Sequence, residues 1–200
     1  MIPDQSVLFA ATGPDGFAYA ADFITAAEEA TLLAGIGTVS FSPFEMRGVV
    51  AKRKVAFFGH SYGRAIEREI PQFLEPLRAR LAVWAGIQPD AFAMALINEY
   101  QPGSPIGWHR DAPQYEIVAG VSLMSSCRMK LRPYVSPADV GHKAARRRAA
   151  YDIVLEPRSA YLLTGSARSD FEHHIPPVSS LRYSVTFRTL RTRSGKGGAV

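Results

Sequence analysis

Short segments rich in β-branched and aromatic residues fill the second half of the chain, with proline and glycine between them and no helical periodicity. This pattern favours an antiparallel sandwich or barrel with helices packed outside it, and it argues against an alternating parallel fold. The predicted fold class is therefore mainly β with flanking helices. The predicted strands are Ala93–Tyr100, Ile117–Met124, Arg128–Tyr134, Tyr151–Leu155, Ala160–Thr164 and Arg182–Leu190.

Two scaffold helices are predicted in the first half of the chain. Thr25 and Glu28 have capping-box spacing and open an Ala/Leu-rich stretch that ends at Gly35 and Gly37. A second helix is expected over about 70–85, where two prolines suit its first turns. Its apolar face consists of Phe73, Leu77, Leu81 and Trp84.

The composition is that of one globular domain: 200 residues, of which 47% are hydrophobic and 20% charged. A single cysteine, Cys127, excludes an internal disulfide and a multi-cysteine metal cluster, and it makes the reducing cytoplasm the expected location. No apolar run approaches the ~20 residues of a membrane helix, and no signal segment is expected. The sequence thus predicts no membrane association, and no obligate protein partner is evident.

The basic balance of the chain favours polyanionic partners, nucleic acid first. The formal charge is +5, and the cations gather in two clusters, over 47–68 and 128–148. Each cluster is equally compatible with a solvated surface. Residues 136–150 are expected to be an exposed loop or insert, residues 1–16 an irregular lead-in, and residues 194–200 a flexible tail.

Two histidines and an aspartate are candidate metal ligands. In an extended segment His109 and Asp111 point to the same side, so both can reach one ion. His173-His174 follows within the strand-rich half and supplies a third ligand. Two histidines and one carboxylate form the facial triad of non-haem Fe(II) oxygenases, although zinc accepts the same donors.

The segment 181–188 alternates strictly between apolar and polar side chains. Arg182, Ser184, Thr186 and Arg188 share one face, which is either an exposed polar surface or the lining of a barrel. Inside a barrel the two arginines would form a site for a dicarboxylate. Asn98 and Tyr100 also share a strand face, and both can donate hydrogen bonds to carboxylate or carbonyl oxygens.

Together these residues resemble the AlkB family of Fe(II)/2-oxoglutarate dioxygenases. The resemblance covers roughly 93–191 and rests on Asn98-x-Tyr100, Gly103, Ile106, His109-x-Asp111, His173 and Arg182-x-Ser184-x-x-x-Arg188. It implies a double-stranded β-helix, or jelly roll, with buttressing α-helices. It implies one domain over 1–193, with N-terminal helices and a substrate lid in 1–92 and the catalytic core in 93–193.

The resemblance also implies a set of site residues. The iron ligands would be His109, Asp111 and His173, with His173 preferred to His174 for its spacing to Ile175. Residues expected to contact 2-oxoglutarate are Asn98, Tyr100, Arg182, Ser184 and Arg188. Of the two arginines, Arg188 is expected at the distal C5 carboxylate and Arg182 nearer the metal. The implied cofactor is Fe(II), with 2-oxoglutarate and O2 as co-substrates.

The expected activity is oxidative demethylation of alkylated nucleobases in DNA or RNA. One departure concerns the substrate: Pro113 stands where the DNA-repair members carry an acidic residue. The lid is expected within 41–62, and candidate substrate contacts are Lys52, Arg53, Phe58, Tyr62, Trp108 and Arg168. The alternatives are the same chemistry on a protein side chain or small molecule, a non-catalytic basic nucleic-acid-binding barrel, and a zinc hydrolase.

Overall fold

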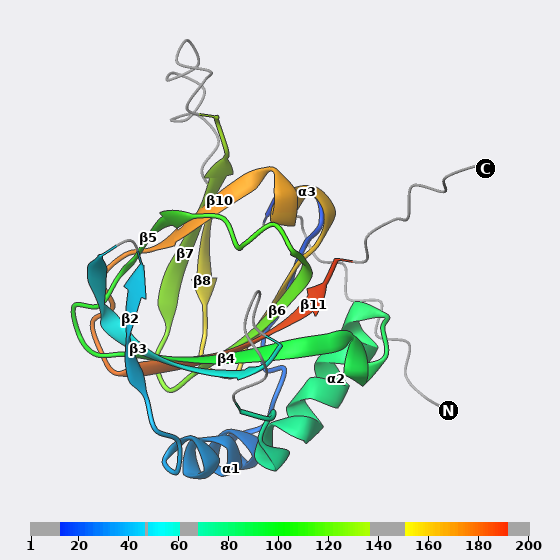
Figure 1. The fold of residues 1–200 in the computed structure, drawn as a ribbon, viewed down its shortest axis with the longest axis vertical. Helices are drawn as coiled ribbons and strands as arrows, with labels where there is room; N and C mark the ends of the chain where they lie inside the picture. Colours follow the sequence, from blue (N-terminus) through cyan, green and yellow to red (C-terminus); the bar gives the residue numbers. More distant parts are fainter. Residues whose placement is uncertain (1–12, 47, 61–67, 137–150, 192–200) are drawn as a thin grey trace.

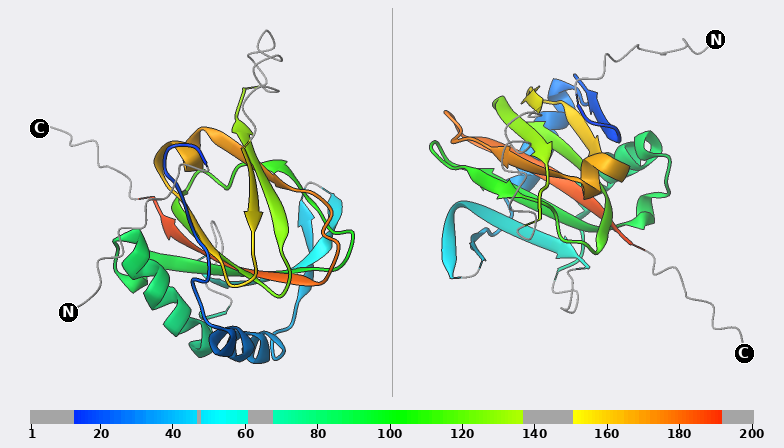
Figure 2. Two further views of the ribbon diagram at one scale, coloured as in Figure 1. Left: turned by 180° about the vertical axis from the view of Figure 1, so that it is seen from behind. Right: turned by 90° about the horizontal axis from the view of Figure 1, so that it is seen from above.

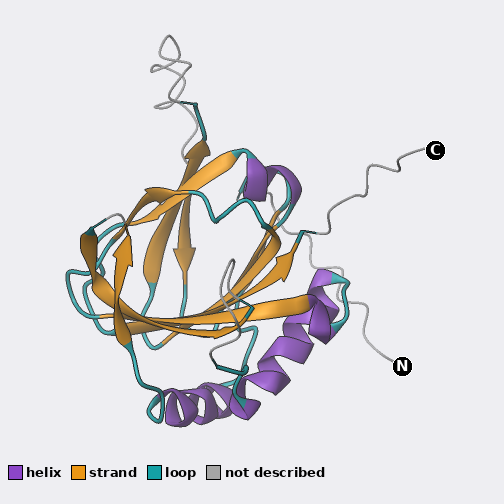
Figure 3. Ribbon diagram, in the orientation of Figure 1, coloured by secondary structure: helices purple, strands orange, loops and turns teal. Residues whose placement is uncertain are grey.

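Two antiparallel sheets face each other and form the body of the protein in the computed structural model, which describes residues 13–46, 48–60, 68–136 and 151–191 (Figures 1 and 3). The larger sheet contains, in spatial order, β1 (Phe17–Ala20), β9 (Ala160–Leu163), β6 (Tyr115–Leu123), β11 (Arg182–Leu190), β4 (Phe92–Tyr100), β3 (Val49–Gly59) and β2 (Ser42–Met46). The smaller sheet contains β5 (Ile106–His109), β10 (Phe171–Ile175), β7 (Cys127–Pro133) and β8 (Tyr151–Leu155). The predicted jelly roll is confirmed.

All six predicted strands are present, and the structure adds β1, β2, β3, β5 and β10. Strand β3 lies within the segment that was expected to form a lid. Its Lys52-Arg53-Lys54 run hides the strand, because Lys is depleted in strands and cationic side chains mask the apolar alternation. Strand β10 was not predicted for a similar reason, because its polar residues Glu172, His173 and His174 mask the apolar alternation. Of these three, only Glu172 is buried.

Both predicted helices are present, and they lie on the side of the larger sheet that faces away from β7 and β8 (Figure 2). Helix α1 (Ala26–Ile36) begins with the predicted capping box and ends at the C-cap Gly37. Helix α2 (Glu75–Ala85) begins five residues later than expected, after the 3-10 turn η1 (Gln72–Leu74), because prolines 71 and 76 favour helix starts. A second 3-10 turn, η2 (Pro89–Ala91), leads into β4, and α3 (Gly165–Ser169) precedes β10.

The helices cover the apolar face of the larger sheet. On β11, Val185 and Phe187 are fully buried and pack in one core cluster with Leu77 and Leu81 of α2. The opposite face of β11 points between the two sheets, where Arg182, Ser184, Thr186 and Arg188 are all at most 8% exposed. The polar stripe is therefore part of the interior, and an exposed polar face is excluded.

Candidate active site

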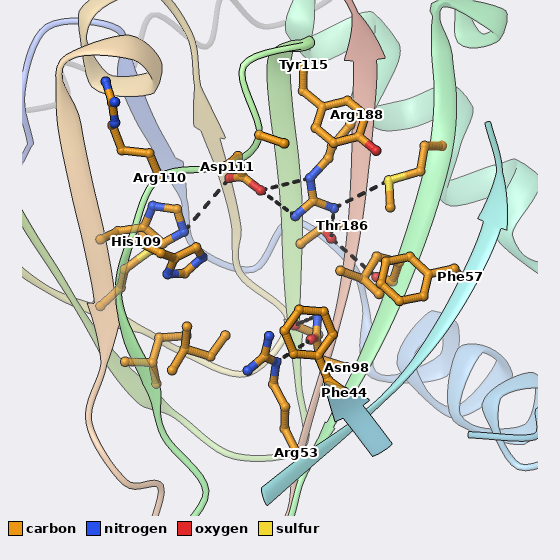
Figure 4. Close-up of a pocket in the computed structure, with 18 of the residues that line it drawn as sticks. Phe44, Arg53, Phe57, Asn98, His109, Arg110, Asp111, Tyr115, Thr186 and Arg188 are labelled. Carbon is orange, nitrogen blue, oxygen red and sulfur yellow. Dashed lines mark hydrogen bonds and ion pairs between the residues drawn. The ribbon is translucent and has the colours of Figure 1, made fainter. Parts of the chain in front are cut away.

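A cavity of about 580 Å³ lies between the two sheets (Figure 4). Its walls come from the inward-facing positions of β3, β4 and β11 on the larger sheet and of β5 and β10 on the smaller one. The side chains that dominate its chemistry are Arg53, Asn98, Tyr100, His109, Asp111, Tyr161, His173, Arg182, Ser184, Thr186 and Arg188. All eight residues expected to bind metal or 2-oxoglutarate therefore line one cavity.

His109, Asp111 and His173 meet at one end of this cavity. His109 and His173 are paired positions of β5 and β10, and their ring centroids are 4.2 Å apart. Asp111 follows β5 by two residues, and its Oδ2 lies 3.9 Å from His173 Nε2. His174 points the other way, stacks on Trp108 and contacts the Ile106 carbonyl, so His173 is the histidine that faces the cavity.

The protonation states of these three groups suit a divalent cation. Burial and then the neighbouring His109 lower the pKa of His173 to about 3, and burial lowers the pKa of His109. Burial raises the pKa of Asp111, but Arg188 and the two imidazoles outweigh it and hold that pKa well below its usual range. Two neutral imidazoles and one carboxylate therefore face each other, and metal binding would release few protons.

The three groups fit a metal but do not form a ready-made cage. No group of three or more His, Cys, Asp or Glu side chains in the described part of the chain is already arranged to hold an ion. Two cis ligands that lie about 2.1 Å from one ion are roughly 3 Å apart, so Asp111 and His173 have about 1 Å to close. The contact between His109 Nδ1 and the Gly107 carbonyl, 2.9 Å, leaves Nε2 of that ring as the ligand atom.

Arg188 is ion-paired with Asp111, which corrects the expected order of the two arginines. Its Nη2 and Nε lie 2.8 and 3.0 Å from Asp111 Oδ1, and its Nη1 donates to Thr186 (Figure 4). Arg188 therefore sits at the Asp111 end of the cavity and not at the far end. Sequence spacing fixes which residues share a strand face, but it does not fix which end of the strand lies near the metal.

Arg182 occupies the opposite end of the same strand face. It is 1% exposed, its Nε donates to Ser122 Oγ at 3.1 Å, and its guanidinium lies 4.9 Å from the Tyr100 ring. Its Nη1 is buried with no hydrogen-bond partner in the described residues, although the side chain lines the cavity. An unsatisfied buried guanidinium N–H is costly, and the carboxylate of a bound ligand would satisfy it.

Asn98 and Ser184 lie between the two arginines, at paired positions of β4 and β11. Asn98 Nδ2 donates to Ser184 Oγ at 3.5 Å, and Asn98 Oδ1 accepts from Arg53 Nε at 3.3 Å. Tyr161, which was not predicted from the sequence, enters the cavity from β9. Its ring lies against Gly120, where an added Cβ would come within 2.4 Å of Tyr161 Cζ, so this glycine makes room for the ring.

Arg53 is the only candidate substrate contact among the described residues that the structure places in the cavity wall. Its guanidinium lies 4.1 Å from the Phe44 ring, and Phe44 contacts Phe57, whose side chain is 39% exposed (Figure 4). The prediction that Phe58 contacts the substrate is wrong. Side chains alternate along β3, so Phe57 faces the cavity and Phe58 is buried in the core beneath it.

Three other candidate substrate contacts lie elsewhere, and a fourth lies outside the described residues. Lys52 shares the β3 face of Phe58 and is exposed. Trp108 stacks on His174 on the outer face of the smaller sheet, with Arg132 3.9 Å from its ring. Arg168 is 5% exposed and donates to the Ala112 carbonyl, so it supports the loop after Asp111. Tyr62 is not described.

The described cations of the two basic clusters are mostly paired. Arg128 and Lys130 both contact Asp152, and Arg132 contacts Glu172. Lys54 contacts Glu99, and Arg68 lies over the Phe58 ring. Arg53 donates to Asn98, and Lys52 is exposed. The other cations of both clusters fall outside the described residues, as does almost all of the predicted loop at 136–150.

Comparisons with known proteins identify the class. Residues 19–189 match the family model of the 2OG-Fe(II) oxygenase superfamily. The solved structures of OsALKBH1 and of a Pseudomonas putida prolyl-4-hydroxylase superpose with TM-scores of 0.59 each, at 14% and 12% identity. The superposition with OsALKBH1 covers 87% of this chain and 98% of the OsALKBH1 chain. The superposition with the prolyl-4-hydroxylase covers 88% of this chain and 94% of the hydroxylase chain. The chain belongs to the 2OG-Fe(II) oxygenase superfamily.

Two curated relatives are similar to this chain. An Arabidopsis thaliana protein named alkylated DNA repair protein ALKBH8 homolog is 29% identical over 205 residues, which cover 85% of this chain and 57% of that protein. Uncharacterized protein L905 of Acanthamoeba polyphaga mimivirus is 27% identical over 140 residues, which cover 62% of this chain and 60% of that protein. The chain thus spans about three fifths of these relatives. The family match favours Fe(II)/2-oxoglutarate-dependent oxygenase chemistry over the non-catalytic barrel and the zinc hydrolase. The similarity to the ALKBH8 homolog agrees with an AlkB-like member of this superfamily.

The described residues contain no helix that is long and apolar enough to cross a membrane.

Proposed function

We propose that His109, Asp111 and His173 hold the Fe(II) of this enzyme. The two imidazoles are kept neutral and Asp111 is kept ionised, and Arg188 fixes the orientation of the Asp111 carboxylate through two hydrogen bonds to one oxygen. Both of these bonds are to Oδ1, so the other oxygen, Oδ2, lies on the side of His173 and is free of Arg188. Three protein ligands on one face would leave room for the co-substrates.

Arg182 would bind the distal carboxylate of 2-oxoglutarate. Its unpartnered Nη1 supplies the donor, and Ser122 orients the guanidinium from behind. Asn98, Tyr100 and Ser184 would supply further hydrogen bonds along the co-substrate. When bound, the iron, 2-oxoglutarate and O2 supply an oxidant that hydroxylates a C–H bond, with succinate and CO2 as the other products.

The proposed substrate is an alkylated nucleobase in DNA or RNA, from which hydroxylation of an N-methyl group releases formaldehyde. The observation that carries this proposal is the cavity wall formed by Phe44, Arg53 and Phe57. Aromatic rings and a guanidinium offer stacking surfaces to a planar base that has left its stack or lies in a single strand. The name of the Arabidopsis relative and the charge of +5 agree with a nucleic-acid partner.

The test is a coupled assay of succinate and formaldehyde over a panel of methylated DNA and RNA oligonucleotides. Formaldehyde release that depends on one lesion, and is lost in Phe57→Ala, is the expected result. Lys52→Ala, on the opposite face of β3, is the matched control and should behave as the wild type. Succinate formation stimulated by methylated peptides and by no oligonucleotide would overturn the nucleic-acid proposal and favour a protein side chain.

The cytoplasmic location and the single domain over 1–193 stay predictions.

A further inference from the structure

A second cleft, of about 340 Å³, adjoins the active-site cavity. The two share Arg110, Asp111 and Ala112 in their linings, so the loop that follows β5 forms the wall between them. The remaining lining residues are Pro113, Arg168, Ser169 and Arg191. The mechanism above gives no role to this cleft.

Three arginines converge on the cleft without a carboxylate partner. In the part of the chain that the structure describes, none of Arg110, Arg168 and Arg191 forms an ion pair with an Asp or Glu. The one acidic residue of the lining, Asp111, is already paired with Arg188. The cleft therefore carries a net positive charge immediately beside the reaction site, whereas most other described cations are neutralised.

Arg168 makes the charge of the cleft unusual, because it is buried. It is 5% exposed, and among the described residues its guanidinium donates one hydrogen bond, from Nη2 to the Ala112 carbonyl. Its Nε is buried without any hydrogen-bond partner. A buried cation with an unsatisfied donor is costly, and an anion in the cleft would satisfy the donor and offset the charge.

Arg110 and Arg191 lie at the open side of the same cleft, where both are exposed. The Arg110 guanidinium lies 3.5 Å from the Tyr134 ring, and its Nη1 donates to the Ser169 carbonyl at 3.0 Å. These contacts hold it beside the cleft, and Figure 4 shows Arg110 turned away from His109 and Asp111. The backbone N–H of Arg191 donates to the Gln114 carbonyl, which ties its strand end to the same loop.

We propose that this cleft binds a phosphate of the nucleic-acid strand whose base enters the cavity. A phosphate oxygen would accept from the buried Arg168, and Arg110 and Arg191 would close over it from the solvent side. The wall shared by cleft and cavity is a single loop, so the two sites can hold adjacent parts of one nucleotide. This inference rests on the proposed nucleic-acid substrate and adds how the backbone of that substrate is held.

The experiment is binding without turnover, which separates this inference from the proposed activity. Fluorescence anisotropy follows a short labelled single-stranded oligothymidylate, which carries no lesion, on the metal-free protein over a range of salt concentrations. Arg191→Gln and Arg110→Gln should each weaken binding about tenfold and reduce the slope of log K against log salt by about 0.7. Lys52→Gln is the matched single-charge control and should change neither quantity by as much.

Further arms identify the source of the anion. A methylated nucleoside lacks phosphate, so its demethylation should respond far less to Arg191→Gln than that of a methylated oligonucleotide does. Arginine variants that bind the oligonucleotide no worse than Lys52→Gln would overturn the inference. Inorganic phosphate that binds to the protein without displacing the oligonucleotide would also overturn it, because the cleft would then hold a free anion. The binding comparison between the arginine variants and Lys52→Gln does not require that any lesion is demethylated. It can therefore fail while the proposed activity stands. A thermal melt of each variant checks that it is folded.

Discussion

At the residue scale, the two arginines of β11 have separate tasks at opposite ends of one strand face. Arg188 is ion-paired with Asp111, whereas Arg182 lines the cavity and has a buried donor, Nη1, without a hydrogen-bond partner. Both are buried and both extend from the same side of the strand, so only their partners distinguish them. The different tasks predict different phenotypes for the two substitutions.

Arg182→Gln should raise the KM for 2-oxoglutarate by roughly 10- to 150-fold, because a hydrogen-bonded ion pair with the distal carboxylate would be lost. Steady-state succinate formation and calorimetric binding of 2-oxoglutarate measure this change. Arg128→Gln, on the outer face of β7 in contact with Asp152, is the control with no expected effect. An unchanged KM in Arg182→Gln would mean that another group holds the distal carboxylate.

His173 predicts how the stability of the metal-free protein depends on pH. Its pKa is about 3 in the folded protein against an ordinary value of 6.5, so the unfolded chain binds more protons between these two pH values. The free energy of unfolding should therefore fall as the pH drops from about 6.5 towards 3. Asp111 adds to the loss below about 3.8, since its folded pKa is also lowered. Urea denaturation between pH 7 and 4 measures the slope, and His173→Asn should flatten it; equal slopes would contradict the assignment.

At the scale of elements, the packing of β9 on β6 brings a tyrosine into the cavity. An Ala at position 120 would place its Cβ 2.4 Å from Tyr161 Cζ and 2.6 Å from its hydroxyl, so the ring must move. The cavity offers the free space. We therefore expect Gly120→Ala to raise the KM for 2-oxoglutarate several-fold. Adding Tyr161→Leu should remove most of that effect, because the two changes share one contact. Strictly additive effects on binding would contradict this explanation.

Helix α1 depends on its N-terminal cap. The Thr25 side chain accepts from the Glu28 backbone N–H, and Glu28 returns the contact and also pairs with Arg80 of α2. Thr25→Ala should lower the free energy of unfolding by about 1 kcal/mol, with little effect on co-substrate binding. Chemical denaturation measures the loss. Ser40→Ala, in the loop after the helix, is a suitable control, and equal stability of the two variants would show that the cap contributes little.

The cap also predicts an acid-sensitive contact between α1 and α2. Arg80 first, and then Thr25, lower the pKa of Glu28 to about 2, against a usual value of 4.5. The contact therefore stabilises the fold above pH 4.5 and is lost as the pH falls through 2.

At the scale of the whole molecule, the sequence predicted the face of each strand better than its position in the sheet. The shared face of the polar residues of β11 and the Asn98–Tyr100 pair followed from alternation with period two. Alternation did not decide whether the β11 face is exposed or lines the barrel interior. The order of Arg182 and Arg188 relative to the metal did not follow from it either, because it depends on the direction of the strand in the sandwich. Tyr161 and Phe57 were missed or passed over because their strands, β9 and β3, pair with partners distant in sequence.

The central claim is that His109, Asp111 and His173 together hold the metal, with Arg182 at the far end of the co-substrate. A crystal structure obtained without oxygen, with Fe(II) and 2-oxoglutarate bound, is the most direct measurement. It should show the iron bonded to those three side chains and the distal carboxylate on Arg182. Iron bonded through His174, or a co-substrate whose distal carboxylate lies on Arg188, would contradict the account.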